Sequence, residues 1–259
     1  MLTTRVKKQI LYGAGYLGFW TLVFFVAYSA FLKPGPSCFD NELNQDEEEV
    51  DCGGSFCISC DIRRLAPIGI KVTKIDHPLF EGSTTFSIEL QNPNSNYGAS
   101  DLEYTVTVYD KEGNLIDSKS RSYLIYPRQV VVDSIMNFEI TPDMVGEVKA
   151  TTKVNTWVSV LDFGAPKTQV RDQKLELDRR GNQFIFSGIL KNDNPFKITK
   201  ATIHGLLYDE MNTLISASQT TALDLVPSEE RFFQIAIPVS PEASEAELKE
   251  PKIFIQVER

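Results

Sequence analysis

A short acidic segment with four cysteines contains the residues best suited to chemistry. The cysteines are Cys38, Cys52, Cys57 and Cys60. No basic residue lies between the first two, and acidic side chains gather there: Asp40, Glu42, Asp46, Glu47, Glu48, Glu49 and Asp51. Cysteines pair as disulfides or bind zinc as thiolates, and carboxylates are ligands that calcium prefers. The sequence therefore offers a disulfide-bonded segment, a metal site, or both.

Two disulfides are the favoured prediction for the cysteines. They would staple a segment that is too short for a hydrophobic core, and each would stabilise it by roughly 2–3 kcal/mol in the chain-entropy model. Four cysteines allow three pairings, and the sequence does not choose among them. Zinc is the weaker alternative, because Cys57 and Cys60 have the ligand spacing but a second close pair is absent. A redox role is not expected, because no βαβ pattern adjoins these two cysteines.

Calcium binding is an independent alternative for the acidic side chains. The oxygen ligands would come from Asp40, Asn44, Glu47 and Asp51. Their spacing is not that of an EF-hand loop, which needs acidic or amide residues and a glycine at fixed positions. No cofactor is predicted apart from this calcium site or the alternative zinc site.

The cysteine segment resembles a short secreted motif of bacterial surface proteins. In this chain it reads C-x-D-N-x-x-N-x-x-E-x-x-V-D-C-G-G-x-x-C-x-x-C, from Cys38 to Cys60. Asn41 stands where glycine is common, and Ser55-Phe56 makes the gap before the third cysteine one residue longer than usual. The resemblance implies an extracytoplasmic module just beyond the membrane, without naming an activity.

An uncharged stretch precedes this segment. Residues 10–32 carry no charged side chain, and Arg5, Lys7 and Lys8 stand before them. About 20 apolar residues cross a bilayer as a helix, and basic residues before the span predict a cytoplasmic N-terminus. Cleavage after Ala27-Tyr28-Ser29 is the alternative, but the uncharged run exceeds the usual signal core of about 7–15 residues. We therefore expect a retained single-span anchor, with everything from Lys33 onward outside the cytoplasm.

The remaining chain has the pattern of an all-β protein. From Ile68, apolar and polar residues alternate with period two, and turns rich in Asn, Pro, Gly and Asp interrupt them. This pattern predicts antiparallel β-sandwiches. The strands expected in the first half are 70–75, 85–90, 102–109, 122–126, 130–140 and 154–161.

The β pattern occurs twice, at an offset of about 100 residues. The segment 86–92, FSIELQN, is similar to 186–192, FSGILKN, and Tyr109-Asp110 matches Tyr208-Asp209. An offset of this size indicates a duplicated domain. The predicted organisation is a cytoplasmic tail (1–9), a transmembrane helix (10–32), an acidic Cys-rich stalk (33–63) and two tandem domains (64–163 and 164–259).

The Tyr-Asp pairs have structural roles in this interpretation. Each tyrosine packs its ring at a strand end, and Asp110 and Asp209 begin turns because Asp side chains accept bonds from nearby backbone N–H groups. The unit resembles the FxLYD-type extracytoplasmic Ig-like β-sandwich, although Val106 and Gly205 replace its leading Phe. The resemblance implies two Ig-like domains and no enzyme activity.

No catalytic or nucleic-acid-binding pattern is found. His77 is expected in a turn and His204 on a sheet surface, and nucleophile, phosphate-loop and zinc-protease motifs are absent. A net charge of −9 is the opposite of a nucleic-acid-binding footprint. The tyrosines and tryptophan at 97, 123, 126 and 157 are expected to pack in or beside the sandwich core.

These observations predict a non-catalytic, membrane-anchored protein of the cell surface or envelope. The sandwiches would be structural or protein-interaction modules, and the partner would be another envelope protein. Two alternatives stay open: a component of a secretion or pilus-type assembly, and a solute- or glycan-binding receptor. A concave aromatic patch would favour the receptor.

Overall fold

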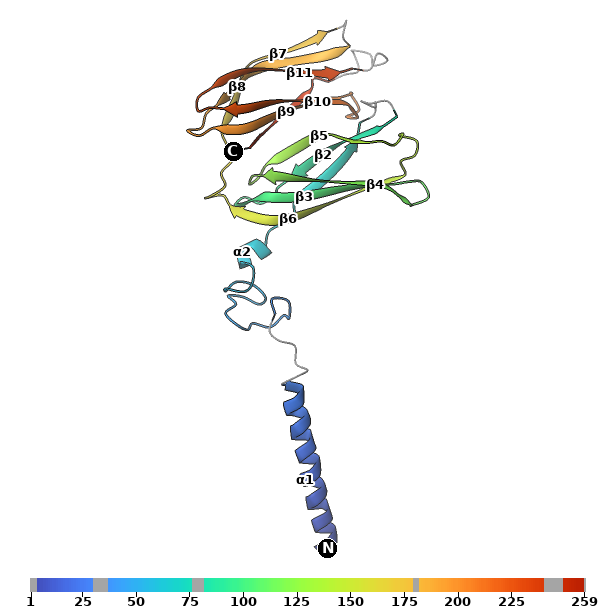
Figure 1. Cartoon of the computed structure of the whole chain (residues 1–259), viewed down its shortest axis with the longest axis vertical. Helices are drawn as coiled ribbons and strands as arrows, with labels where there is room; N and C mark the ends of the chain where they lie inside the picture. Colours follow the sequence, from blue (N-terminus) through green and yellow to red (C-terminus); the bar gives the residue numbers. More distant parts are fainter. Residues whose placement is uncertain (1–3, 30–36, 76–81, 179–181, 240–248, 259) are drawn as a thin grey trace. The chain divides into compact units, whose positions relative to one another are not determined.

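The computed structural model describes residues 4–29, 37–75, 82–178, 182–239 and 249–258. The chain divides into two compact units, Met1–Leu65 and Ala66–Arg259. The first contains an apolar helix and the disulfide-bonded segment, and the second contains β-structure (Figure 1). The mainly β architecture predicted from the sequence is confirmed. His77 and residues 30–32 of the predicted span lie outside the described residues.

The N-terminal helix α1 spans Thr4–Ala27, so it begins six residues before the predicted span. Its first turns include Arg5, Lys7 and Lys8, which the sequence analysis placed in a tail. No side chain of α1 is buried within the protein. The helix is long and apolar enough to cross a membrane, a property that retained anchors and signal sequences share. A second helix, α2, covers only Cys60–Arg63.

Two sheets form the first half of the β-unit, and all their strand pairs are antiparallel. One has the order β1-β2-β5 and the other β4-β3-β6. The strands are β1 (Gly69–Lys74), β2 (Thr84–Gln91), β3 (Tyr97–Tyr109), β4 (Leu115–Ile125), β5 (Val130–Phe138) and β6 (Glu147–Ser159). Buried apolar residues from both sheets join one core cluster, so the sheets pack face to face.

The second half repeats this arrangement. Its sheets have the orders β11-β8-β7 and β10-β9-β12 and share a second core cluster. The strands are β7 (Thr168–Asp178), β8 (Gln183–Asn192), β9 (Ile198–Tyr208), β10 (Leu214–Leu225), β11 (Glu230–Pro238) and β12 (Lys252–Glu258). The predicted hairpins are confirmed, because the returning strands begin at Leu115 and Leu214.

One asparagine per half organises the turn after the matching strand. Asn92 is 1% exposed, and its Nδ2 donates to the carbonyl oxygens of Tyr97 and Tyr126 at 2.8 and 3.1 Å. Asn192 is fully buried, and its Nδ2 donates to those of Phe196 and Leu225, both at 3.0 Å. These bonds satisfy buried backbone groups in both halves.

A second asparagine then fastens the chain that enters each half. Asn94 accepts a bond from the backbone N–H of Ala66 and donates to its carbonyl, at 3.0 and 2.8 Å. Asn194 makes the same pair of bonds with Lys167, at 2.9 and 2.8 Å. The duplication seen in the sequence is therefore present in individual hydrogen bonds.

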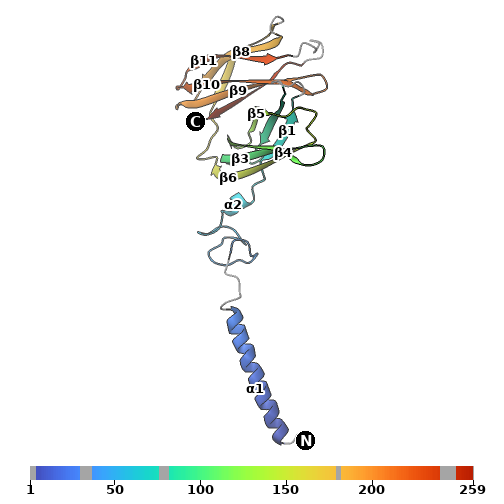
Figure 2. The same cartoon turned by 45° about the vertical axis from the view of Figure 1, so that its right-hand side comes forward.

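The two halves stack through one sheet of each. A third apolar cluster joins Ile75 and Val132 of the first half to Leu206, Leu214 and Ala217 of the second. Strand β5 lies against β9, β10 and β12. Both views show the sheets of this unit as successive layers, with β5 of the first half next to β9 and β10 of the second (Figures 1 and 2). Among the described residues of this unit, no strand packs on the outer face of β4-β3-β6 or on the outer face of β11-β8-β7.

Candidate functional site

The four cysteines form two disulfides in the segment after α1. Cys38 pairs with Cys57, and Cys52 pairs with Cys60, with Cα–Cα distances of 5.5 and 4.9 Å. The sequence predicted the chemistry but not this pairing. Paired sulfurs offer no thiolate, so this state of the segment excludes the alternative zinc site. Disulfides of this kind form and persist outside the reducing cytosol.

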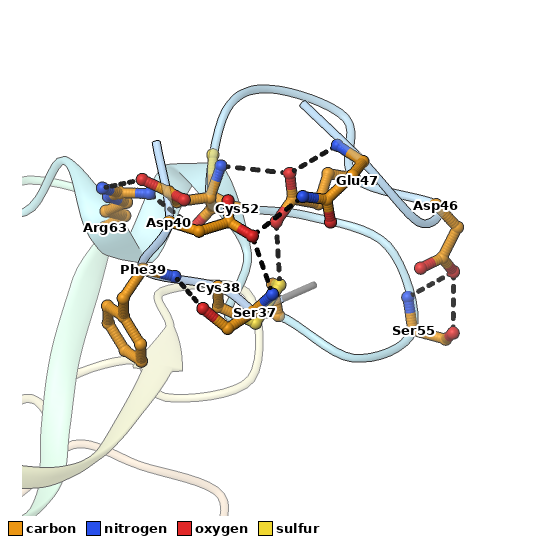
Figure 3. The surroundings of a disulfide bond; sticks show 12 residues. Ser37, Cys38, Phe39, Asp40, Asp46, Glu47, Cys52, Ser55 and Arg63 are labelled. Carbon is orange, nitrogen blue, oxygen red and sulfur yellow. Dashed lines mark hydrogen bonds and ion pairs between the residues drawn. A yellow bond between two sulfur atoms is a disulfide. The ribbon is translucent and has the colours of Figure 1, made fainter. Parts of the chain in front are cut away.

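The carboxylates of this segment bind its own backbone. Asp40 accepts bonds from the N–H groups of Ser37 and Glu42 and from Asn44 Nδ2, each at 2.9 Å. These bonds, led by that of Ser37, hold the pKa of Asp40 below its ordinary value. Asp46 is bound in the same way by Ser55, through its hydroxyl and N–H at 2.7 Å (Figure 3).

Glu47 and Asp51 continue this pattern closer to the disulfides. Glu47 Oε2 accepts the N–H groups of Asn44 and Asp51 at 3.2 Å, and its Oε1 lies 3.3 Å from the Cys57 sulfur. The Asp51 carboxylate is 2% exposed in its side chain and pairs with Arg63 at 3.2 Å. Arg63 also donates to the Asp51 carbonyl. The acidic residues thus replace a hydrophobic core as the scaffold.

The three carboxylates among the predicted calcium ligands, Asp40, Glu47 and Asp51, do not gather as one cluster. Among the described residues, potential ligand atoms of Cys, His and acidic side chains come within 4.8 Å of one another in two groups. One contains Glu47 with Cys38 and Cys57, and the other contains Glu49 with Cys52 and Cys60. Because the sulfurs are paired, each group supplies one carboxylate. The calcium site stays a prediction. The carboxylate oxygens of Asp40, Glu47 and Asp51 have hydrogen-bonded partners within the segment, whereas the buried Asn44 Oδ1 has no hydrogen-bond partner among the described residues.

Two adjacent glycines allow the tight fold of the segment. Gly53 and Gly54 have φ angles of +80° and +70°, which L side chains rarely adopt. A Cβ on Gly54 would lie 2.4 Å from the carbonyl oxygen of Asp46. The Gly-Gly pair in the motif is therefore a steric requirement for closing the loops around Cys52.

Large apolar side chains on this segment face solvent. Phe39 is 84% exposed and Phe56 is 77% exposed, although each directly adjoins a cysteine of the Cys38–Cys57 disulfide. Three other apolar residues of the segment are also exposed: Leu43, Val50 and Ile58. The exposed surface of this acidic segment is therefore partly aromatic and apolar.

The only described histidine lies between the two β halves and not on an open surface. His204 is 1% exposed, because the β1-β2-β5 sheet covers the face of β9 on which it stands. Its Nδ1 lies 2.9 Å from Ser134 Oγ, which also donates to Gln219 at 3.4 Å. Burial lowers the pKa of His204 from 6.5 to about 4; Lys200 contributes in the same direction, while Asp133 opposes it. The expectation of a sheet-surface histidine is wrong, since stacking of the halves is not visible in the sequence.

A serine–histidine hydrogen bond suggests nucleophilic catalysis, but its position argues against it. Ser134 on β5 is fully buried between the two stacked sheets, and the described hollows do not include it. A nucleophile must reach its substrate. The contact therefore joins buried polar groups where the two halves stack, beside the apolar cluster.

Sequence analysis missed a buried charged group in the first half. Asp133 is 4% exposed; the Tyr104 hydroxyl donates to it at 2.5 Å, and Arg121 pairs with it at 2.5 Å. Burial, reinforced by the Asp133 charge, raises the pKa of Tyr104. An Asp directly after three valines in Val130–Asp133 was the available signal, because an acid in an apolar strand needs a partner.

The repeat-motif residues lie at matching turns. Asp110 accepts bonds from the N–H groups of Glu112 and Asn114, and Asp209 accepts one from that of Thr213. Tyr109 and Tyr208 each lie under a lysine, with the Nζ 5.0 and 4.8 Å from the ring centroid. All four residues lie at hairpins, and neither aspartate lines either of the hollows found among the described residues.

The aromatic residues considered for a binding patch do not form one. Tyr126 is 2% exposed and stacks on Phe163 at 4.5 Å, and Trp157 packs against the first core. Tyr123 lies beside Tyr104 and lines a hollow of about 280 Å³ with Lys200 and Glu258. Tyr123 is the one aromatic residue among those that line this hollow, unlike the concave aromatic surface expected of a glycan receptor.

Comparisons with known proteins assign no family. No protein-family model matches the chain, and no curated protein matches it. A transglutaminase from red sea bream is similar over 76% of this chain, with 13% identity and a TM-score of 0.26; the match spans 29% of its length. A cupin 2 conserved barrel domain protein from Leptotrichia buccalis matches over 73% of this chain and 89% of its own, with 8% identity and a TM-score of 0.10. Similarities this low assign neither fold nor activity.

Proposed function

We propose that this chain is a membrane-anchored, non-catalytic extracytoplasmic protein that binds another protein of the cell envelope. The observation that carries the proposal is the disulfide-bonded segment, which follows an apolar helix and exposes two aromatic rings, Phe39 and Phe56. The disulfides favour an oxidising compartment, and the exposed rings favour a binding role.

The apolar helix acts in this proposal as a retained signal anchor. Arg5, Lys7 and Lys8 would hold its N-terminal end in the cytoplasm. A helix of 24 residues at about 1.5 Å per residue is about 36 Å long, which suffices for the hydrocarbon core. The segment from Cys38 onward would then lie outside the cytoplasm, where the disulfides persist.

The β-unit acts as a pair of tandem Ig-like sandwiches. Support comes from two three-stranded antiparallel sheets around one core in each half, and from the matching Asn and Asp turns. Such modules display faces and edges without needing a catalytic centre. The buried Ser134–His204 contact would help to fix the position of one half against the other.

The partner surface should be apolar at its centre and basic around it. Phe39 and Phe56 supply the apolar contact, and the surrounding segment supplies exposed acids such as Glu42 and Glu48. Charge complementarity of this kind steers encounter, and buried aromatic anchors supply most of the binding free energy.

Site-specific photo-crosslinking in intact cells tests the proposal. A photoreactive phenylalanine analogue at position 56, and separately at 39, should capture one envelope protein. The matched control carries the analogue at Leu161, which is 90% exposed but lies outside the segment. A Phe39→Ser variant should reduce capture from position 56, because both rings would contact the same partner.

Two results would contradict the proposal. One is the absence of any protein adduct from both positions under conditions that capture a known envelope complex. The other is equal capture from Leu161, which would show that exposure alone, and not the disulfide-bonded segment, determines the contact.

A further inference from the structure

A face of the second half corresponds to the face by which the first half docks. Glu89 pairs with Val132 across β2 and β5, and Ile189 pairs with Phe232 across β8 and β11, at an offset of 100 residues. Val132 is 1% exposed because the second half covers it, whereas Phe232 is 65% exposed. The outer face of β11-β8-β7 thus resembles a docking face on which none of the described strands packs.

This face has an apolar centre with balanced charges around it. Leu190 and Phe186 point into the core, so the alternating residues of β8 point outward. The outward apolar residues, given by strand pairing, are Phe232, Ile189, Ile185 and Ala236. The outward charges are Arg171, Lys174 and Lys191 against Glu176, Asp178 and Glu230. A second copy of the same face would therefore meet no net repulsion.

The order of these residues along the strands is self-complementary. Successive rows across the sheet are Arg171-Ile189-Phe232, then Lys174-Ser187-Gln234, then Glu176-Ile185-Ala236. A two-fold axis in the interface, perpendicular to the strands and through the middle row, would exchange the outer rows. Phe232 would then face Ala236, Ile189 would face Ile185, and Arg171 would face Glu176 of the second copy. The large Phe232 would meet the small Ala236, and Arg171 would meet the oppositely charged Glu176. Lys174 of the middle row would face its own counterpart, and its charge is paired with Glu176 of its own chain at 2.7 Å.

We propose that the outer face of β11-β8-β7 is a self-association surface that binds the same face of a second copy through this two-fold contact. The free β4-β3-β6 face fits less well as an occupant, because hydroxyl pairs such as Thr105–Ser120 cover it. The proposed surface lies outside the disulfide-bonded segment, so self-association can fail while the proposed function holds.

The size of the face predicts a weak contact. Strands β7, β8 and β11 have 11, 10 and 9 residues. At about 3.4 Å per residue and about 4.8 Å between strands, the face covers on the order of 450 Å². Stable interfaces bury about 800 Å² per partner. Dimers should therefore form when anchoring concentrates the chains in one membrane and should dissociate on dilution in detergent.

Thiol crosslinking of the full-length protein in its membrane tests the contact. Gln234→Cys places an exposed thiol in the middle row, where it faces its own counterpart across about 10 Å, the spacing of packed sheets. The native cysteines are paired, so the introduced thiol is the reactive one. A bis-maleimide of about 10 Å reach should produce a covalent dimer that contains only this chain. The matched control is Ser118→Cys, exposed on the β4-β3-β6 face.

Charge reversal supplies the deciding comparison. In the Gln234→Cys background, Glu176→Arg should lower the dimer yield at least fivefold, because two arginines would meet across the axis. Adding Arg171→Glu should restore it. The proposal is overturned if the Gln234→Cys and Ser118→Cys yields are equal, if Glu176→Arg has no effect, if the double reversal does not rescue, or if the adduct contains another protein.

Discussion

The two β halves share a hydrogen-bonded scaffold but differ in what their outer faces carry. Asn92 and Asn192 satisfy equivalent backbone carbonyls, and Asp110 and Asp209 begin equivalent turns. On the outer face of β3, Thr105 bonds to Ser120 and faces solvent, whereas the equivalent position on β9 is the buried His204. Turn chemistry thus determines the shared fold, and substitutions on one face determine which sheets can stack.

The largest expected effect tests the shared scaffold. Asn92→Ala and Asn192→Ala should each lower the free energy of unfolding by roughly 3–5 kcal/mol, because each leaves several buried polar groups without partners. The two losses should agree within about 1 kcal/mol. Chemical denaturation of the detergent-solubilised protein measures both. A large loss in one half alone would show that the matching networks are not equivalent in energy.

The next effect tests a difference between the halves: the buried His204 of the second half, where the first half has Thr105. The pKa of His204 is about 4 in the folded protein and near 6.5 unfolded, so the unfolded chain binds more protons between these values. Stability should therefore be unaffected above about pH 6.5 and should fall by roughly 3 kcal/mol as the pH drops to 4.

Thermal denaturation at pH 7.5 and 4.5 measures this loss. His204→Thr, which introduces the side chain of the first half, should make the difference between the two pH values much smaller. An unchanged difference would assign the acid sensitivity to other groups.

A smaller effect compares the covered and uncovered faces. Val132→Ala should cost about 1–2 kcal/mol, because Val132 is buried where the halves stack. Phe232→Ala, at the equivalent but exposed position, should change the stability of the dilute protein by less than about 0.5 kcal/mol. Denaturation midpoints of the two variants give the comparison. Equal losses would mean that Phe232 already packs against this chain.

The smallest effect tests the polar outer face of the first half. Thr107→Leu introduces the residue type found at Leu206, but here the site has a hydroxyl bond to Ser118 at 3.1 Å and no covering sheet. Stability should change by no more than about 0.5 kcal/mol in either direction. Chemical denaturation of Thr107→Leu and of Leu206→Thr in parallel provides the measurement. Leu206→Thr should lower the free energy of unfolding by more than about 1 kcal/mol, because Leu206 is buried where the halves stack. Similar losses would remove the distinction between the faces.

Sequence patterns predicted the features that depend on local chemistry. The period-two alternation, the Asp turns and the repeated asparagines were visible because each follows from neighbouring residues. Strands β3 and β6 nevertheless begin five and seven residues before their predicted starts at 102 and 154. Their first residues are Tyr97 and Glu147. Polar residues on an exposed sheet face weaken the apolar signal there, although the backbone still pairs.

Features that depend on distant contacts could not be predicted. The pairing of Cys38 with Cys57 requires a three-dimensional path that cysteine spacing does not encode. The burial of His204 follows from one sheet covering another, and the role of Asp133 follows from Tyr104 and Arg121 on other strands. The exposure of Phe39 and Phe56 could not be predicted either, because it depends on acidic side chains that bind the backbone of the segment in place of a hydrophobic core.

Thiol labelling of intact cells tests most directly whether the disulfide-bonded segment lies outside the cytoplasm. The full-length chain should acquire no mass tag from a membrane-impermeant maleimide, and four tags after an impermeant reductant opens both disulfides. Tags that appear without reductant, and only after the membrane has been permeabilised, would contradict the account. They would show reduced cysteines in the cytoplasm.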